Sequence, residues 1–342
     1  MSTRTRLTLL TATVAVAAMA MTGCVAGEGT APETPAQGSE WSDTTLTLDF
    51  ATYNPLSLII KDQGWLEAEL GDDVTVEWVQ SAGSNKANEA LRAGAIDVGS
   101  TAGSAALLAR SNGSPIQTIA IYTQPNWAAL AVPTGSDITE VADLAGRTVA
   151  ATKGTDPYFF LLQALAEAGL ALEDISLQNL QHADGKTALE TGAVDAWSGL
   201  DPLLATSVYN GAAEIIYDNV DFNSYGFLNA TEEFITSNPD LAQLVVNAYE
   251  KARQWALENP EETAAILAEV AGIDLAIAEA TIARTVIDIS NVPGDAQRDV
   301  LAIIGPIFVE SGDVPNQQLI DEALEALFND TFATAADPAA IG

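Results

Sequence analysis

The chain alternates short apolar stretches with longer stretches in which apolar residues recur every three or four positions. The first pattern predicts strands and the second predicts helices. Strands are expected at 46–51, 74–80, 96–99, 116–122, 128–132, 148–151, 176–180 and 214–217. Helices are expected at 55–69, 85–93, 104–111, 157–168, 239–258 and 261–271. This alternation favours an α/β protein whose sheets are rich in parallel strands and carry helices on both faces.

Four of the expected strands run directly into a short polar loop that begins a helix. The junctions lie at 46–55, 96–104, 147–157 and 194–202. Three of them place Asn54, Asp156 or Asp201 before a proline, the order of an N-cap followed by the first helical turn. A helix N-terminus presents unpaired N–H groups and partial positive charge, so each junction is able to accept an anion. One such junction is ordinary in an α/β chain, but four of them indicate a shared binding pocket.

An internal repeat predicts two lobes of similar build. The segment ALRAGAIDVGS, which starts at Ala90, matches ALETGAVDAWS, which starts at Ala188, at an offset of 98 residues. Each copy has a glutamine and a lysine upstream, namely Gln80 with Lys86 and Gln181 with Lys186. A cleft between two lobes is the natural place for a small ligand.

The N-terminal segment predicts export. An apolar run at 7–20 follows two arginines and is too short to form a stable membrane-spanning helix, so residues 1–23 are interpreted as a cleaved signal peptide. Cys24, the only cysteine, follows directly and resembles the lipobox cysteine of bacterial lipoproteins, which is lipidated and becomes the mature N-terminus. Residues 24–43 are rich in Gly, Ala, Pro, Glu and Thr and predict a flexible tether.

Length, charge and composition exclude several classes of function. The 319 residues that remain after the signal peptide suffice for two domains with their own cores. A formal net charge of -34 argues against nucleic-acid binding, because phosphate groups would be repelled. His182 is the only histidine, so no Ser-His-Asp or Cys-His constellation with spare partners and no zinc set of His and Cys can be assembled. The sequence therefore predicts no enzyme, no cofactor and no metal, and it predicts an ordinary loop position for His182.

The junctions are better supplied for binding than for catalysis. Their hydroxyl groups can donate to an oxyanion beside helix N–H groups: Ser81, Ser84, Ser100, Thr101, Ser104, Thr155 and Ser198. Nearby aromatic side chains are candidates either for the wall around an apolar tail or for core packing: Tyr53, Trp127, Tyr158, Phe159, Trp197 and Tyr225. Lys153 is the cation that precedes the third junction. Asp156 and Asp201 are interpreted as helix N-caps, and either would favour a ligand with a cationic end if it faced the cleft instead.

Several of these segments together resemble a known family over about residues 46–332. The likeness is carried by ATYNP, AGSNKANEALRAGAIDVGS, ATKGTDPYFFLLQAL, HADGKTALETGAVDAWSGLDP and YGFLNA. The chain resembles the periplasmic or lipid-anchored substrate-binding proteins of ABC importers, in particular the aliphatic sulfonate-binding branch. Binders of nitrate, taurine and thiamine precursors are related branches.

The resemblance implies a two-lobed α/β fold, the periplasmic-binding-protein type II fold, with a hinge of two crossing strands. One lobe would comprise 44–130 and 228–335, and the other 131–227. The crossings would fall near 127–133 and 222–228. The implied ligand-binding residues are Tyr53, Asn54, Ser81, Ser84, Ser100, Thr101 and Gly103 on the first lobe, Gln124 and Trp127 near the hinge, Lys153, Thr155, Asp156, Tyr158, Trp197, Ser198 and Asp201 on the second lobe, and Tyr225 nearby.

The family function implied is transport. Such a protein is a monomer that binds a small sulfonate outside the cytoplasmic membrane and delivers it to an ABC permease. The alternatives that the sequence leaves open are taurine, nitrate or bicarbonate, a thiamine-precursor pyrimidine, a cationic or zwitterionic amine, and an exported enzyme on the same scaffold.

Overall fold

The structure is a computed structural model that describes residues 41–342. The signal peptide at 1–23, Cys24 and most of the tether at 24–43 lie outside the described residues, so their predictions stay predictions. The described residues, 41–342, belong to one compact unit. Within the described part of the chain, no helix has both the length and the apolar character needed to cross a bilayer.

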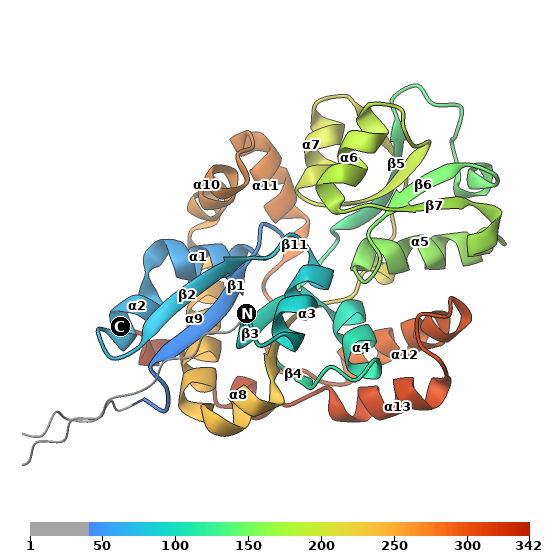
Figure 1. Cartoon of the computed structure of the whole chain (residues 1–342). Coiled ribbons are helices and arrows are strands. Elements are labelled where there is room, and N and C mark those ends of the chain that lie inside the picture. The colour runs from blue at the N-terminus through green and yellow to red at the C-terminus, as the bar shows by residue number, and fades with distance from the viewer. Residues whose placement is uncertain (1–40) are drawn as a thin grey trace, which may run out of the picture. The chain divides into compact units, whose positions relative to one another are not determined.

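The first sheet has six strands in the order β11-β4-β10-β3-β1-β2 (Figure 1). Strand β1 pairs in parallel with β2 and β3, whereas β10 pairs antiparallel with β3 and β4. The strands are β1 Thr45–Phe50, β2 Thr75–Gln80, β3 Val98–Ala102, β4 Ile116–Pro125, β10 Gly226–Thr231 and β11 Thr285–Val286.

The second sheet has five strands in the order β7-β6-β8-β5-β9 and is green to yellow in Figure 1. Strand β6 pairs in parallel with β7 and β8, and β5 pairs antiparallel with β8 and β9. The strands are β5 Ala128–Pro133, β6 Thr148–Ala151, β7 Ser176–Asn179, β8 Ala196–Leu200 and β9 Ala213–Tyr217. The chain thus passes from the first sheet to the second between β4 and β5, and it returns between β9 and β10.

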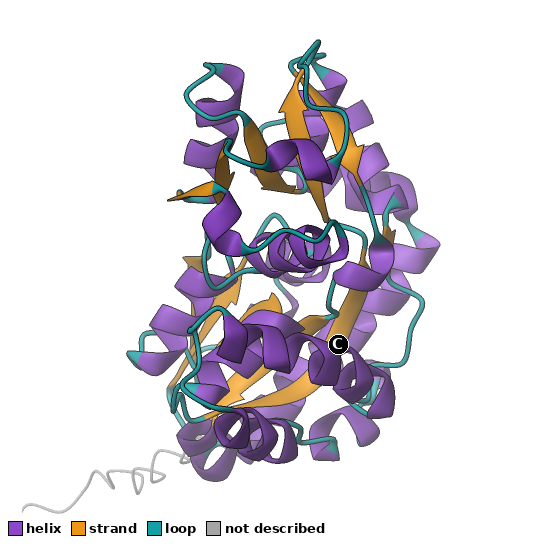
Figure 2. Ribbon diagram, turned by 90° about the vertical axis from the view of Figure 1, so that its right-hand side faces the viewer, coloured by secondary structure: helices purple, strands orange, loops and turns teal. Residues whose placement is uncertain are grey.

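Helices flank the strands of both sheets (Figure 2). The N-terminal helices are α1 Pro55–Gln63, α2 Trp65–Leu70, α3 Ser84–Arg92 and α4 Gly103–Ser111. Those attached to the second sheet are α5 Asp156–Glu167, α6 His182–Glu190 and α7 Leu203–Tyr209. The C-terminal part adds α8 Glu232–Ser237, α9 Pro239–Glu258, α10 Pro260–Ala271, α11 Leu275–Ala283, α12 Asp295–Glu310, α13 Gln317–Ala326 and α14 Thr331–Thr334.

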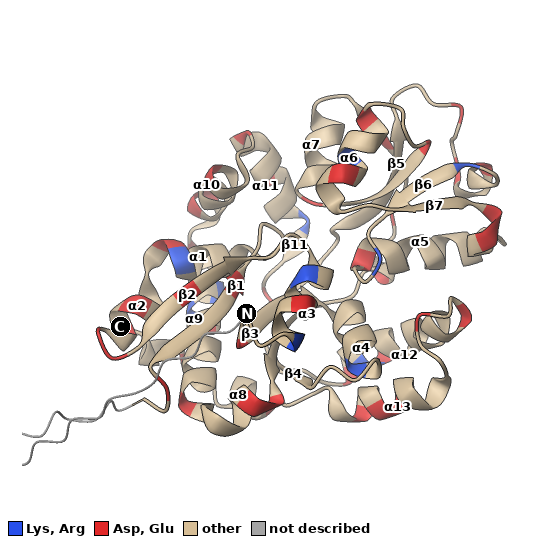
Figure 3. Cartoon of the chain, viewed as in Figure 1, with Lys and Arg blue, Asp and Glu red and all other residues tan. Residues whose placement is uncertain are grey.

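Successive side chains of a strand point to opposite faces of its sheet, so each strand contributes to two separate cores. In β5, Ala128, Leu130 and Val132 join the core beneath α5, while Ala129 and Ala131 join a separate core with residues of α6 and α7. Strand β1 buries Leu46 and Leu48 against α1 and α9 in the same way. The acidic side chains lie dispersed over helices and loops, and in the described residues no acidic run is longer than two (Figure 3).

The predicted α/β class is confirmed, and most predicted elements match within one or two residues. Three of the expected elements differ by more. The strand expected at 116–122 is β4, Ile116–Pro125, which continues three residues further. The helix expected at 55–69 is two helices, because Gly64 adopts a left-handed conformation at φ 62° and ends α1. The strand expected at 96–99 is β3, Val98–Ala102, because antiparallel pairing with β10 extends it.

Candidate functional site

The repeat places two aspartates at equivalent points of the two sheets. Asp97 precedes β3, and its carboxylate accepts a hydrogen bond from Thr47 N–H in the neighbouring strand at 2.8 Å. Asp195 precedes β8, and its carboxylate accepts from Thr148 N–H at 2.7 Å. Each aspartate therefore fixes the start of a parallel strand. Because both copies of the repeat need this bond, the aspartate stands at the same position in each copy.

The two serines of the repeat lie within strands. Ser100 is in β3 and Ser198 is in β8, both fully buried, so the prediction that they occupy junction loops is wrong. Ser100 Oγ donates to Asp49 at 3.0 Å, and Ser198 Oγ donates to the carbonyl of Pro157 at 2.6 Å. Because a hydroxyl has one proton, neither serine has a proton left to donate to a ligand in this conformation.

The hydroxyl groups of the predicted threonines also donate their protons to acceptors within the protein. Thr101 Oγ1 donates to Ala102 O at 2.9 Å, and Thr155 Oγ1 donates to Thr152 O at 2.6 Å. Ser84 differs from them. Its hydroxyl oxygen accepts from Ala102 N–H at 2.9 Å, so its proton stays available to a ligand.

Asp156 lies in helix α5 of the second sheet, and its carboxylate connects this helix by hydrogen bonds to residues near the first sheet. It was expected to be the N-cap of that helix, but Thr155 precedes the helix and Asp156 is its first residue. The Asp156 carboxylate accepts hydrogen bonds from Trp127 Nε1 at 2.7 Å, from Ser224 N–H at 2.8 Å, from Ser224 Oγ and from Ser104 Oγ. The N-cap prediction is wrong because these four donors, distant in sequence, turn the carboxylate away from its own helix. Burial raises the pKa of Asp156, while the hydrogen bonds lower it.

Asp49, which the sequence did not single out, lies in β1, within the first junction. It is 1% exposed, accepts from Ser100 N–H at 2.8 Å, and has one carboxylate oxygen without a hydrogen-bond partner. Burial raises the pKa of Asp49 to about 7, and the hydrogen bonds from Ser100 lower it only in part. Tyr53 stands beside it, with its hydroxyl donating to Ser100 O at 3.0 Å.

His182 was expected in a loop, and that prediction is wrong. It is the first residue of α6 and is 2% exposed, and desolvation lowers its pKa to about 4. Thr152 Oγ1 donates to Leu180 O at 2.6 Å, so His182 Nδ1, 3.2 Å away, is the donor to Thr152. His182 Nε2 is therefore the unprotonated nitrogen, and it has no hydrogen-bond partner.

The N-termini of α3 and α6 meet at this histidine. A methyl group added at Gly83 would lie 2.9 Å from both Asn85 Oδ1 and His182 Nε2. Asn85 Oδ1 is buried and has no partner either. Neither helix has a side-chain cap on its first N–H groups. We call this place the anion seat, defined by Gly83, Ser84, Asn85, Gln181 and His182.

Asp201 lies at the opposite side of the predicted site. Helix α7 begins at Leu203, so Asp201 is one residue outside the N-cap position, although its Oδ1 still accepts from Ala205 N–H at 3.0 Å. Its Oδ2 has no hydrogen bond and lies 3.7 Å from Arg284 Nη1. Burial raises the pKa of Asp201 to about 6 against the lowering effect of Arg284. The sequence missed Arg284, which lies 83 residues away.

A small cavity connects Asp201 with two predicted aromatic residues. Tyr53 and Trp127 pack edge to face, with ring centroids 6.0 Å apart. Together with Asp201 and Thr281 they line a cavity of about 10 Å³, enough for about one water. The structure thus brings Tyr53, Ser100, Trp127 and Asp156 into one contiguous group.

Other predicted residues point elsewhere. Asn54 is confirmed as the N-cap of α1 and also donates to Tyr249 at 3.0 Å. Lys153 Nζ lies 4.0 Å from Asp313 Oδ1, and Tyr158 donates to the same carboxylate at 3.0 Å. The remaining residues are Trp197, which is buried beneath Gly185 of α6, Gln124 and Tyr225, which are half-buried, and Gly103, whose N–H donates to Tyr225 O at 2.9 Å.

Among residues 41–342, no group of three or more His, Cys, Asp or Glu side chains is placed to hold a metal ion. The site offers hydrogen-bond donors and acceptors. The donors at the anion seat are helix N–H groups and the Ser84 hydroxyl, and the acceptors are Asn85 Oδ1 and His182 Nε2.

Known proteins share this fold. The alkanesulfonate-binding protein SsuA from Xanthomonas axonopodis pv. citri, whose structure is bound to MOPS, is 25% identical with a TM-score of 0.74. The match covers 82% of this chain and 98% of SsuA, which confirms the predicted two-lobed periplasmic-binding-protein fold.

Two relatives are named as aliphatic sulfonates-binding proteins. One from Escherichia coli (strain K12) is 31% identical over 200 residues, which are 58% of this chain and 63% of the relative. The chain thus spans less than two thirds of that relative's length. One from Bacillus subtilis (strain 168) is 27% identical over 232 residues, 67% of this chain and 70% of the relative. The profile of the family described as "NMT1/THI5 like" matches residues 58–263, and the chain belongs to this family.

Proposed function

We propose that this chain is the extracytoplasmic substrate-binding component of an ABC importer and that it binds a small aliphatic sulfonate between its two sheets. The observation that carries the proposal is the anion seat, where two uncapped helix N-termini meet beside buried polar atoms without partners. The ligands named for SsuA and for the two relatives support a sulfonate as the ligand class.

A sulfonate matches the donors of the seat. Its three oxygens accept hydrogen bonds, and the first N–H groups of α3 and α6, together with the Ser84 hydroxyl, are donors without a protein acceptor. A sulfonate oxygen against His182 Nε2 favours the protonated imidazole, so binding raises the pKa of His182 and Nε2–H then donates to the ligand.

The other proposed site residues bind the ligand less directly. Tyr53 and Trp127 form an aromatic wall for an alkyl tail, and Asp156 holds Trp127 in place through the bond at 2.7 Å. The lobe boundaries at 44–130 with 228–335 and at 131–227 belong to this proposal, since closure of the two lobes would complete the seat.

Binding calorimetry tests the proposal. Ethanesulfonate and butanesulfonate are titrated into the purified protein beside taurine, nitrate, bicarbonate and a thiamine-precursor pyrimidine. The alkanesulfonates are expected to bind most tightly. Tight binding of nitrate or the pyrimidine with no response to any sulfonate would overturn the ligand class.

A matched pair of glycine variants tests the seat itself. Gly83→Ala places a methyl group 2.9 Å from His182 Nε2, so ethanesulfonate affinity is expected to fall at least about ten-fold, or 1.4 kcal/mol. Gly294→Ala is the control, because a methyl group there meets nothing within 4 Å. Equal affinity of the Gly83→Ala variant and the unaltered protein would refute the placement of the sulfonate.

A second candidate is a sulfonate that also carries an amino group. Asp201 Oδ2 is buried and has no hydrogen bond, although Arg284 Nη1 lies 3.7 Å away, so a ligand ammonium group could donate a hydrogen bond to it. In that case taurine binds more tightly than ethanesulfonate, and Asp201→Asn removes the difference.

The proposal extends to location and partners. Lipidation of Cys24 would anchor the protein to the outer face of the cytoplasmic membrane, where a monomer passes its ligand to the permease. Cell fractionation of Cys24→Ala tests the anchor, since the variant is expected in the soluble fraction.

A further inference from the structure

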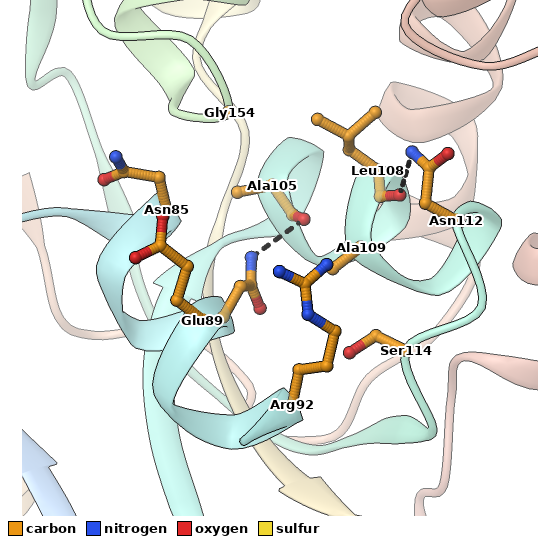
Figure 4. A pocket seen from close by; sticks show the side chains of 10 residues that line it. Asn85, Glu89, Arg92, Ala105, Leu108, Ala109, Asn112, Ser114 and Gly154 are labelled. Carbon is orange, nitrogen blue, oxygen red and sulfur yellow. Dashed lines mark hydrogen bonds between the residues drawn. The ribbon is translucent and has the colours of Figure 1, made fainter. Parts of the chain in front are cut away.

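A cavity of about 220 Å³ lies between α3 and α4, and one side of it is closed by Gly154 of the loop before α5 (Figure 4). The residues that matter for its chemistry are Asn88 and Arg92 of α3, Ala105, Leu108 and Ala109 of α4, and Ser114 of the following turn. Apart from Asn85, which lines both places, this cavity shares no residue with the anion seat.

One end of the cavity carries positive charge. Arg92 stands in the last turn of α3, and Figure 4 shows its guanidinium extending toward α4. No ion pair with Arg92 occurs within residues 41–342. Glu89, which also lines the cavity, is paired with Lys86 at 2.7 Å. The guanidinium is therefore free to take a planar anion in a two-pronged arrangement.

A buried hydroxyl lies at the same end. Ser114 is 4% exposed, and its Oγ has no hydrogen-bond partner in the described chain. Buried polar groups normally have a partner, so an unpaired hydroxyl that lines a cavity indicates a ligand or a water there. Ser114 and Arg92 together supply the donors that a carboxylate needs.

The other polar group of the cavity is an acceptor. Asn88 Nδ2 donates to Ala105 O at 3.0 Å, and this bond fixes the orientation of the amide. Its Oδ1 is buried and has no partner. Asn88 and Arg92 are four residues apart on one helix, so their Cα atoms are about 6 Å apart along the axis and face the same side.

The α4 side of the cavity is apolar. Ala105, Leu108 and Ala109 line it opposite α3. A ligand that fits must therefore have an anionic end, a short apolar spacer and a donor at its other end.

We propose that this cavity binds a small zwitterion of the ω-amino carboxylic acid type. Its carboxylate pairs with Arg92 and accepts from Ser114, and its ammonium donates to Asn88 Oδ1. The proposal does not depend on the sulfonate function, because its charged residue, Arg92, lies outside the anion seat.

Saturation-transfer NMR and calorimetry with β-alanine test this proposal on the full-length protein. β-Alanine is expected to bind at least ten-fold more tightly than propionate or ethylammonium, each of which offers only one charged end. Arg92→Gln and Ser114→Ala are expected to weaken β-alanine binding at least ten-fold and three-fold. Arg147→Gln, which removes a surface arginine paired with Asp137, is the control and should change nothing.

Two further measurements separate this cavity from the seat. Asn88→Ala should weaken β-alanine but leave propionate unchanged, because only the ammonium contacts Asn88. Saturating ethanesulfonate should not displace β-alanine. Displacement by ethanesulfonate, unchanged binding in Arg92→Gln, or no detectable binding of β-alanine would each overturn the proposal. Sulfonate binding at the anion seat is tested separately by Gly83→Ala.

Discussion

Replacement of Asp49 by asparagine should stabilise the protein, and increasingly so as the pH rises. The carboxyl group is buried in β1 and accepts from Ser100 N–H and Ser100 Oγ. Asparagine keeps an oxygen in place for both donors, and it cannot ionise. The variant therefore removes the cost of a buried charge while it retains the hydrogen bonds.

The expected magnitude follows from the pKa of Asp49. Burial raises the pKa from 3.8 to about 7, so the folded state holds the proton more tightly than the unfolded chain between these two values. The contribution of this group to the free energy of unfolding falls as the pH rises from about 3.8 to about 7, and it falls no further well above pH 7. A difference of about 3 units corresponds to about 4 kcal/mol, at about 1.4 kcal/mol per unit. The stabilisation by Asp49→Asn should thus be about 4 kcal/mol at pH 8 and about 1 to 2 kcal/mol at pH 5.

Urea unfolding of both proteins at pH 5 and pH 8 measures this difference. The comparison at each pH cancels the contributions of all other titrating groups, and Asp321→Asn on the exposed face of α13 controls for the loss of one negative charge. A stability difference that stays constant between pH 5 and pH 8, or a variant less stable than the unaltered protein at pH 8, would refute the reasoning.

Two further predictions concern buried polar groups. His182 has its pKa lowered to about 4 by burial, so the unfolded chain takes up a proton first, and stability should fall by about 3 kcal/mol as the pH drops from about 6.5 to 4. His182→Gln should abolish that part of the loss in urea unfolding, and an unchanged pH dependence would contradict it. Asp156→Ala leaves the donors of Ser104, Ser224 and Trp127 without an acceptor and should cost about 3 to 5 kcal/mol, with a smaller loss for Asp156→Asn. A loss below 1 kcal/mol by thermal unfolding of Asp156→Ala would show that the network contributes little.

The fold was predictable because its signals are local. The helix at 239–258 matches α9 residue for residue, since Pro239 begins it and helical periodicity continues to Glu258. The exceptions involve partners distant in the chain. Strand β3 extends to Ala102 only because β10, more than a hundred residues later, pairs with it. A pattern read along β3 alone contains no trace of that pairing.

The site was less predictable, because the properties of its side chains arise from burial and from distant partners. Ser100 and Ser198 were expected in junction loops but lie in strands, and the acceptors that take hydroxyl protons, such as Asp49 for Ser100, are invisible in the local sequence. His182 was overlooked because its polar neighbours suggested a loop. A signal for its position was available in the repeat. Gln181 aligns with the junction before α3, so His182, the next residue, could have been expected to begin a helix.

The two equivalent aspartate–threonine hydrogen bonds, which we call the aspartate clamps, have a consequence for the order in which the sheets fold. Asp97 holds Thr47 and Asp195 holds Thr148 through the same type of bond, so the two clamps are chemically interchangeable. Thr148 lies nearly as far along the chain from Asp97 as from Asp195, and loop closure therefore discriminates little between the right and the wrong partner. Synthesis from the N-terminus does discriminate, because Asp97 can pair with Thr47 before Thr148 exists. A chain that refolds from denaturant lacks this order. In such a chain, the strand that contains Thr148 can compete with the strand that contains Thr47 for Asp97.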